Sequence, residues 1–181
     1  MYKDILNDKL VLSVFLDLSK AFDTVDHEIL IYKLEHAGVS FLAIKLLKSY
    51  LSCRKLVAYT DKSICSSMKT IKLGVPQGSI LGPLFYILYV NDLIHAMSSS
   101  SMHLYADDTV LSSSSVDLQV CVRSLEHTLE RVEAWFNANY LKVNQSKSKA
   151  IIFRKRTVQS HPCLQNIHIK FINDCIHPEK K

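Results

Sequence analysis

The chain has 181 residues, of which 48% are hydrophobic, and this composition excludes a disordered protein and suffices for one folded domain or part of a larger one. The longest apolar run, residues 84–90, is far too short for a membrane-spanning helix. The net charge of +5 favours a polyanionic partner, and five cysteines without a Cys-x-x-Cys spacing indicate neither a zinc site nor a disulfide framework. We therefore expect an intracellular protein of the cytoplasm or nucleus with no membrane partner.

Apolar periodicity and helix-capping residues predict helices and strands in alternation, and serine runs at 98–101 and 112–115 are interpreted as connections. In chain order the predicted elements are a strand at 10–16, helices at 26–36 and 40–52, paired strands at 56–59 and 68–73, a loop at 74–78, a helix at 79–97, hairpin strands at 102–105 and 109–111, a helix at 117–137, and strands at 150–153 and 167–172. Apolar residues at helical spacing predict a core-facing stripe on the helix at 117–137, formed by Leu118, Val122, Leu125, Leu129, Val132 and Phe136.

Two adjacent aspartates, Asp107 and Asp108, stand in the apolar frame of residues 104–111. Adjacent carboxylates repel each other, and a divalent cation converts this repulsion into shared attraction. The flanking residues suit short strands, so the pair is expected at the turn of a hairpin. An ordinary solvated turn is the alternative, because aspartate is a common turn residue.

A third carboxylate, Asp17, comes directly after the buried strand predicted at 10–16. A carboxylate that leaves a buried strand is well placed to join Asp107 and Asp108 at the mouth of a sheet. Three such carboxylates can hold two divalent ions. This arrangement suits nucleotidyl transfer, in which positioning and charge neutralisation provide most of the catalysis.

The loop at 74–79 has a composition that fits the same chemistry. Gly74 and Gly78 allow the backbone to approach a ligand closely, Pro76 stiffens the loop, and Gln77 offers a donor and an acceptor. Most loops that contain Gly and Pro are only turns, which is the alternative here.

The back half of the chain is basic, with no acidic residue between Glu133 and Asp174. Such a stretch indicates a polyanionic partner, and a solvated basic face is the alternative. The run Arg154, Lys155 and Arg156 is the candidate for contacts with a nucleic-acid backbone.

Four blocks in this order resemble reverse transcriptases, most closely those of non-LTR retrotransposons of the LINE or jockey type. The blocks are FLDLSKAFD at 15–23, GVPQGS at 74–79, YADD at 105–108 and NQSK at 144–147. The resemblance runs from about residue 10 to 153. It implies an α+β fold over 1–157, a polymerase palm with partial fingers in which an antiparallel sheet packs on the helices at 79–97 and 117–137.

The resemblance also implies that no complete thumb is present and that residues 158–181 form a C-terminal tail. The basic fingers strands that would precede Asp17 in this family are expected to be missing as well. We therefore expect a chain that is truncated at both ends.

By position in these blocks, the resemblance implies an RNA-directed DNA polymerase that adds dNTPs to a DNA or RNA primer on an RNA template with two Mg²⁺ or Mn²⁺ ions. Asp17, Asp107 and Asp108 would be catalytic and metal-binding, and the backbone carbonyl of Leu18 would be a further metal ligand. Lys147 would protonate the leaving pyrophosphate, with Lys149 as its nearest competitor and exposed surface lysine as the alternative for both.

Other positions would contact the nucleotide and the template. Phe22 would exclude the ribose 2′-hydroxyl, with ordinary core packing as the alternative. Asp23 and Asp26 match the family pattern but are expected to serve a turn and a helix cap. The expected nucleotide- and template-binding set is Phe22, Gly74, Pro76, Gln77, Gly78 and Tyr105.

Two other functions remain open from the sequence. The chain could be a catalytically inactive retrotransposon remnant that folds and at most binds nucleic acid. It could also be an RNA-dependent RNA polymerase or another palm enzyme, although Phe22 and the Tyr105-Ala106 pair favour the reverse-transcriptase branch.

Overall fold

A computed structural model describes residues 2–60, 63–64, 66–97, 100–155, 169–171, 174–176 and 178–179. The chain forms two compact units, the first made of residues 1–19 and 92–181 and the second of residues 20–91. No helix in the described part is long and apolar enough to cross a membrane. The domain boundary predicted after residue 157 lies outside the described residues and stays a prediction.

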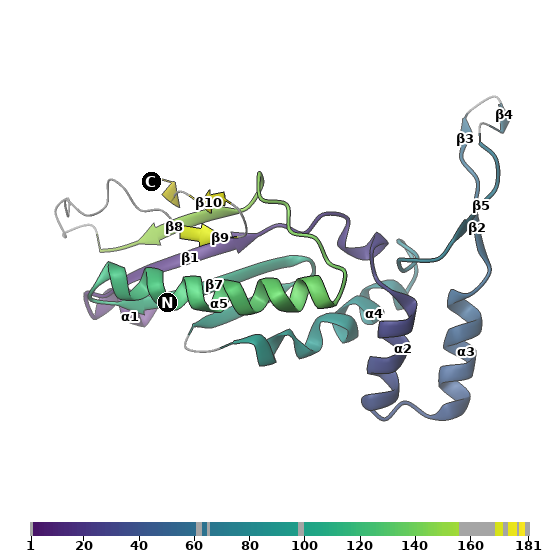
Figure 1. The fold of residues 1–181 in the computed structure, drawn as a ribbon, viewed down its shortest axis with the longest axis horizontal. Coiled ribbons are helices and arrows are strands. Elements are labelled where there is room, and N and C mark those ends of the chain that lie inside the picture. Colours follow the sequence, from purple (N-terminus) through teal and green to yellow (C-terminus); the bar gives the residue numbers. More distant parts are fainter. Residues whose placement is uncertain are drawn as a thin grey trace. The chain divides into compact units, whose positions relative to one another are not determined.

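The first unit is built on a five-stranded sheet (Figure 1). Its strand order is β11-β8-β1-β7-β6, and every neighbouring pair is antiparallel except β11 with β8. The strands are β1 (Leu10–Leu16), β6 (Ser101–Tyr105), β7 (Asp108–Ser115), β8 (Lys149–Phe153) and β11 (Pro178–Glu179). The α+β class and the antiparallel pairing of the four predicted strands are therefore confirmed.

Strand β1 lies at the centre of this sheet because almost all of its residues are apolar and buried. Its polar member, Ser13, lies directly opposite Ser112 of β7, and their hydroxyl oxygens are 2.7 Å apart. The interpretation of residues 112–115 as a connection is wrong, because this serine run continues β7. A buried hydroxyl is tolerated there because it is paired across the ladder.

Helix α5 (Leu118–Ala138) packs on β7 and β1 in the first unit (Figure 1). The Asp117 carboxylate caps it by accepting from the Gln119 amide at 2.9 Å. All six residues of the predicted stripe are buried, which confirms that stripe. Burial also raises the pKa of the Cys121 thiol, which lies on the same face.

Shorter elements complete the first unit. The Lys170 amide donates to the Glu126 carboxylate at 3.0 Å, which joins β9 to α5. These elements are α1 (Tyr2–Leu6), the antiparallel pair β9 (Ile169–Phe171) and β10 (Asp174–Ile176), and most of the 3₁₀ segment η2 (Asn91–Ala96). Of these, β9 was predicted as a strand and η2 as the end of a longer helix, whereas α1 and β10 were not predicted because short elements carry too few residues for a periodic pattern.

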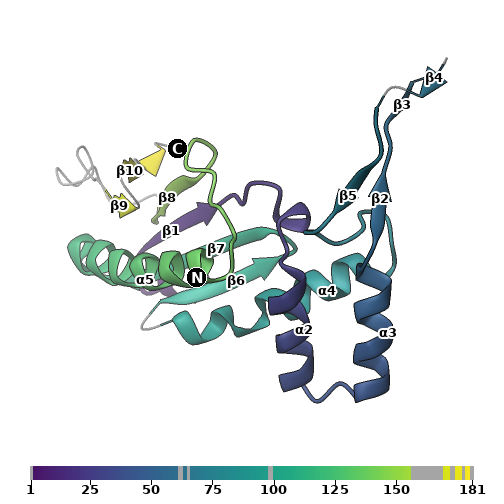
Figure 2. The ribbon, with the colours of Figure 1, turned by 45° about the vertical axis from the view of Figure 1, so that its right-hand side comes forward.

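The second unit contains three helices and a projecting β-ribbon (Figure 2). Asp26 and Ser40 cap the first two helices with their side chains, as the sequence predicted. The helices are α2 (His27–His36), α3 (Phe41–Leu51) and α4 (Leu81–Val90), and the 3₁₀ turn η1 (Ala21–Asp23) precedes them. The helix predicted at 79–97 is thus divided into α4 and η2.

The strands of the ribbon in the second unit differ in their bounds from the prediction. Strand β2 (Arg54–Leu56) pairs with β5 (Lys69–Ile71), and the two-residue strands β3 (Tyr59–Thr60) and β4 (Ser63–Ile64) pair beyond them. The ribbon therefore begins two residues earlier than expected. Neither face of a ribbon this exposed carries a hydrophobic pattern that could fix the register.

Candidate active site

The first unit brings Asp17, Asp107 and Asp108 to one end of its sheet. Strands β1 and β7 are antiparallel, and their last opposed residues at this end are Leu16 and Thr109. Asp17 follows Leu16 and Asp108 precedes Thr109, so the two aspartates continue the register as the next opposed positions. Opposed residues in such a ladder have Cα atoms about 4.5–5.5 Å apart. The register therefore places Asp17 opposite Asp108, beside the turn that carries Asp107.

The hairpin between β6 and β7 holds the aspartate pair on a two-residue turn. Ala106 and Asp107 form this turn, and Tyr105 pairs with Asp108 across it. Ala106 has a φ of 52°, a left-handed conformation that is uncommon for a residue with a Cβ. Asp108 is thus the first residue of β7 rather than part of the turn, and it is exposed while Asp107 is half-buried.

A turn before β8 fixes the backbone of Asp17. The Asp17 amide donates to the Ser148 hydroxyl at 3.3 Å, and the Asp17 carbonyl accepts from the Asn144 amide at 2.8 Å. The Ser148 hydroxyl in turn donates to the Asn144 carbonyl at 2.9 Å. Lys147, which is exposed, belongs to this turn. The predicted NQSK block is therefore joined to Asp17, and Ser148 is a residue of the candidate site that the sequence did not reveal.

The carbonyl of Leu18 remains outside these bonds. Leu18 forms an isolated antiparallel bridge with Val143, and the bridge uses the Asp17 carbonyl and the Ser19 amide. The side chain of Leu18 is buried, so only its backbone is a candidate ligand.

The carboxylates provide the donor atoms of a divalent-metal site. Carboxylate oxygens are the ligands that Mg²⁺ prefers in proteins. Within the described residues, none of the three has a hydrogen-bond or ion-pair partner that would occupy its oxygens. As the side chains stand, however, no three His, Cys, Asp or Glu of the described part form a group that could hold a metal.

Phe22 and the loop at 74–79 belong to the second unit, where several bonds join them. The Val75 amide donates to the Phe22 carbonyl at 2.8 Å, and the Gln77 side chain donates to the Asp23 carboxylate at 2.8 Å. The ring of Phe22 lies 4.6 Å from that of the buried Tyr86, centroid to centroid, and stays half-exposed. The expectation that Asp23 serves a turn agrees with its bond to Gln77.

Glycine is required at position 74 because the loop at 74–79 passes close to the backbone of Asp23. It has a φ of 83°, and a Cβ placed on it would lie 2.7 Å from the Asp23 carbonyl oxygen. Gly78 also has a positive φ, of 78°, but a Cβ there would meet nothing within 4 Å. Pro76 occupies the turn between them, where its carbonyl accepts from the Ser79 hydroxyl at 2.7 Å.

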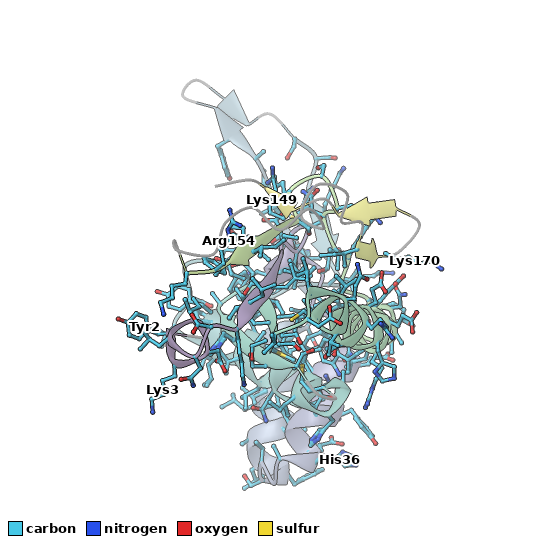
Figure 3. All side chains as sticks on the ribbon, turned by 90° about the vertical axis from the view of Figure 1, so that its left-hand side faces the viewer. Tyr2, Lys3, His36, Lys149, Arg154 and Lys170 are labelled. Atoms are coloured by element: carbon cyan, nitrogen blue, oxygen red, sulfur yellow. The ribbon has the colours of Figure 1, made fainter. Side chains whose placement is uncertain are left out.

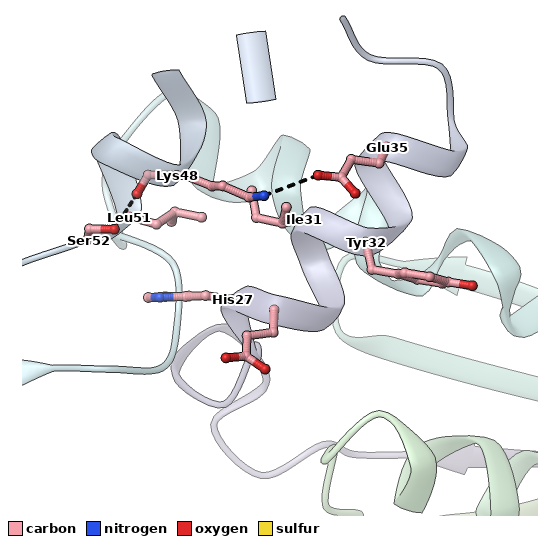
Figure 4. A pocket seen from close by; sticks show the side chains of 8 residues that line it. His27, Ile31, Tyr32, Glu35, Lys48, Leu51 and Ser52 are labelled. Atoms are coloured by element: carbon pink, nitrogen blue, oxygen red, sulfur yellow. Dashed lines mark hydrogen bonds and ion pairs between the residues drawn. The ribbon is translucent and has the colours of Figure 1, made fainter. Parts of the chain in front are cut away.

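A separate pocket of about 470 Å³ lies between α2 and α3 (Figure 4). The Lys48 ammonium and the Glu35 carboxylate form an ion pair across it at 3.2 Å. His27 reaches the Gly74 carbonyl with Nε2 at 2.8 Å, so this nitrogen carries the proton. The pocket contains none of the predicted site residues.

The basic run lies away from the carboxylates. Strand β8 is antiparallel to β1, so Lys149 is at the carboxylate end of the sheet and Arg154 follows the opposite end. Lys155 is paired with Asp8 at 3.1 Å, which offsets its charge. Arg156 lies outside the described residues.

Comparison with known proteins decides the family. The profile of the family described as Reverse transcriptase (RNA-dependent DNA polymerase) matches residues 4–172. The chain belongs to the reverse transcriptase family. It is 30% identical over 158 residues to the RNA-directed DNA polymerase from mobile element jockey of Drosophila melanogaster, a match that covers 83% of this chain and 17% of the relative. It is 36% identical over 154 residues to the probable RNA-directed DNA polymerase from transposon BS of the same species, over 81% and 17% of the two chains.

This reverse transcriptase chain therefore spans about 17% of the length of these curated relatives. Its fold resembles apo telomerase from Candida tropicalis truncated from its C-terminal domain, with a TM-score of 0.62 and 14% identity over 87% of this chain and 34% of that one. A second telomerase structure from this species, in complex with a fragment of telomeric RNA, has a TM-score of 0.59 at 14% identity over 83% and 28%. These likenesses support the polymerase palm fold predicted from the four blocks. Reverse transcriptases generally use divalent metal ions, in line with the carboxylate set.

Proposed function

We propose that this chain carries the nucleotidyl-transfer site of an RNA-directed DNA polymerase, which extends a DNA or RNA primer with dNTPs on an RNA template. The observation that carries the proposal is the register of β1 with β7, which continues with Asp17 facing Asp108 beside the Asp107 turn. Membership in the reverse transcriptase family supports the same reaction.

In this mechanism Asp17, Asp107 and Asp108 would hold two Mg²⁺ or Mn²⁺ ions, with the Leu18 carbonyl as a further ligand. The ions, when bound, would lower the pKa of the primer 3′-hydroxyl and neutralise the leaving pyrophosphate. The turn at 144–148 would keep Asp17 in place through its two backbone bonds. Lys147 would give a proton to the pyrophosphate as it leaves.

We propose further that Phe22 selects dNTPs over rNTPs. A ring against the C2′ carbon of the sugar leaves no room for a hydroxyl, and the stack on Tyr86 holds this ring in one orientation. Gln77, with Gly74, Pro76 and Gly78 around it, would line the template and nucleotide pocket, and Tyr105, which is exposed, would contact the same substrates.

The central test is primer extension on an RNA template with dNTPs and Mg²⁺ or Mn²⁺. Asp107→Asn with Asp108→Asn should abolish extension, because asparagine removes the anionic oxygens that hold the metal. Asp117→Asn is the matched control, because Asn caps α5 as well as Asp does and residue 117 follows the opposite end of β7. Extension at the wild-type rate by the double variant would refute the assignment of the pair.

The gate assignment is tested separately. Phe22→Val should raise the use of rNTPs relative to dNTPs, because the smaller side chain leaves space for the 2′-hydroxyl. The ratio of kcat/KM for the two nucleotide classes measures this change. An unchanged ratio, with extension from dNTPs retained, would show that Phe22 only packs against Tyr86.

A further inference from the structure

The ribbon of the second unit carries an unbalanced positive charge. We define the basic ribbon as residues 54–72; its sequence contains five basic residues, Arg54, Lys55, Lys62, Lys69 and Lys72, against one acidic residue, Asp61. Of these, the structure describes the side chains of Arg54, Lys55, Lys69 and Lys72. None of the four forms an ion pair within the described residues.

The strand register distributes these cations over both faces of the ribbon. Directly opposed residues share a face, and so do residues two apart in one strand. Lys69 is opposite Leu56, which lies two residues after Arg54, so Arg54 and Lys69 lie on the same face. Lys55 lies on the other face, opposite Thr70. The phosphates of a nucleic-acid backbone could therefore contact the basic ribbon from either face.

Apolar and aromatic side chains are exposed between the cations. Tyr59 is 72% exposed, and Leu56 and Met68 are 60% and 62% exposed. An exposed aromatic ring beside cations is the combination with which proteins bind unpaired nucleic acid, because a base stacks on the ring while the phosphates meet the cations.

The basic ribbon also lacks the packing that stabilises a sheet. Its described strands form only the two-stranded pairs β2-β5 and β3-β4, and they extend away from α2 and α3 of the same unit (Figures 1 and 2). An isolated two-stranded ribbon is only marginally stable in water. Its base is held by the Gly74 amide, which donates to the Val25 carbonyl at 2.7 Å, and by the bridge of Asp26 with Leu73.

We propose that the basic ribbon binds single-stranded RNA, with Arg54, Lys55, Lys69 and Lys72 on the phosphates and Tyr59 stacked on a base. Charge complementarity selects a polyanion, and the exposed ring selects unpaired bases over a duplex, whose bases are already stacked. The choice of RNA over DNA rests on the proposed function. The contact itself does not depend on catalysis.

The experiment measures binding of the whole chain to a labelled oligouridylate without dNTPs, in the Asp107→Asn, Asp108→Asn background. Lys55→Gln with Lys69→Gln should lower the slope of log affinity against log salt by about 1.4, because each phosphate contact of a single strand contributes about 0.7. The matched control is Lys3→Gln with Lys45→Gln, which removes the same charge from exposed lysines in α1 and α3; Figure 3 shows Lys3 pointing into solvent.

Tyr59→Ala tests the stacking contact and does not change the charge. It should weaken binding of the oligouridylate by roughly 5- to 150-fold, while Tyr59→Phe should leave it within about twofold, since stacking needs only the ring. Binding of an RNA duplex of equal length should respond to the two lysines but not to Tyr59.

Three results would overturn the proposal. The first is an equal loss of binding in the ribbon pair and in the control pair, which would make the effect one of net charge. The second is unchanged binding in both the ribbon pair and Tyr59→Ala. The third is tighter, Tyr59-dependent binding to anionic lipid vesicles than to oligouridylate, which would identify a membrane surface as the partner.

Because binding is measured in a background without the aspartate pair, failure of the proposed catalysis cannot mimic failure of this inference. Ribbon-dependent binding without any primer extension would keep the inference and reject the activity. Primer extension by the chain, together with RNA binding that does not change when the basic ribbon is altered, would keep the activity and reject the inference.

Discussion

Asp17 has both its backbone amide and its backbone carbonyl bonded to the turn at 144–148. The Asp17 amide donates its hydrogen bond to the hydroxyl of Ser148, a residue that is 5% exposed. Ser148 also donates to the Asn144 carbonyl and so closes the turn that carries Lys147. This makes Ser148 a positioning residue for the site.

Ser148→Ala should weaken metal binding and lower the rate of extension by about tenfold, which corresponds to roughly 1.4 kcal/mol in the barrier. The substitution leaves the buried Asp17 amide without its acceptor and frees the turn. The concentration of Mg²⁺ that gives half-maximal extension should rise, and Ser148→Thr should restore it because threonine keeps the hydroxyl. A purely structural role would instead reduce the folded fraction and leave the Mg²⁺ dependence unchanged.

Lys147 and Lys149 can be separated by the same assay. If Lys147 protonates pyrophosphate, Lys147→Gln should lower kcat by about 100-fold or more, which is the usual contribution of a general acid. Lys149→Gln should have a much smaller effect, since Lys149 is the first residue of β8 rather than part of the turn. A larger loss from Lys149→Gln would transfer the role to that residue.

At this scale the sequence predicted the residues whose chemistry is rare. Adjacent aspartates in an apolar frame and a carboxylate after a buried strand are unusual, so Asp17, Asp107 and Asp108 were recognisable. Ser148 was not, because serine is common and its role depends on a bond across 131 positions of the chain. That Asp108 begins β7 while Asp107 stays in the turn was not predicted, because no residue type signals that boundary.

Elements with strong periodicity were predicted with nearly correct ends. The stripe of α5 and the capping residues Asp26 and Ser40 are local signals, and all three are confirmed. The prediction for residues 112–115 was wrong because serine is typical of loops, and these residues form a strand only because they pair with β1. The predicted bounds of the ribbon strands were shifted because they depend on pairing rather than on burial.

The loop at 74–79 allows its two glycines to be compared directly. Gly74→Ala should destabilise the protein by about 2–5 kcal/mol, because it adds a clash with the Asp23 backbone to the cost of a left-handed residue. Gly78→Ala should cost only about 1–2 kcal/mol, because its φ is similar but its surroundings are open.

Urea unfolding followed by circular dichroism measures both variants. The difference between them isolates the steric part of the cost. Equal destabilisation would mean that the backbone at Asp23 moves away at no cost, and that the loop is not fixed against the segment after Phe22.

The first unit is assembled from chain segments that are far apart in sequence. Strand β1 pairs with β7 about a hundred positions later, and residues 20–91 lie between them as the second unit. The sequence predicted the α+β class and four of the five strands of this sheet, because each of the four contains apolar or strand-forming residues. It did not predict that the chain leaves the first unit at Lys20 and returns to it at Asp92, since that division depends on contacts between distant segments.

The stability of the catalytic end should follow that of the core below α5. Leu125 is fully buried on the inner side of α5, whereas Val120 on the outer side of the same helix is 48% exposed. Leu125→Ala should therefore destabilise the first unit by about 2–5 kcal/mol, and Val120→Ala should change it by less than about 0.5 kcal/mol. Trp135, the single tryptophan of the chain, lies on α5 and reports this transition by its fluorescence.

Because β1 and β7 carry both the carboxylates and the surface on which α5 packs, primer extension should be lost at the same urea concentration at which the fluorescence changes. Leu125→Ala should lower both midpoints together. If extension instead disappears while the fluorescence of Trp135 is still native, then the ends of β1 and β7 open locally. In that case the bonds of Asp17 with the turn at 144–148, and not the packing of α5, determine how long the site survives.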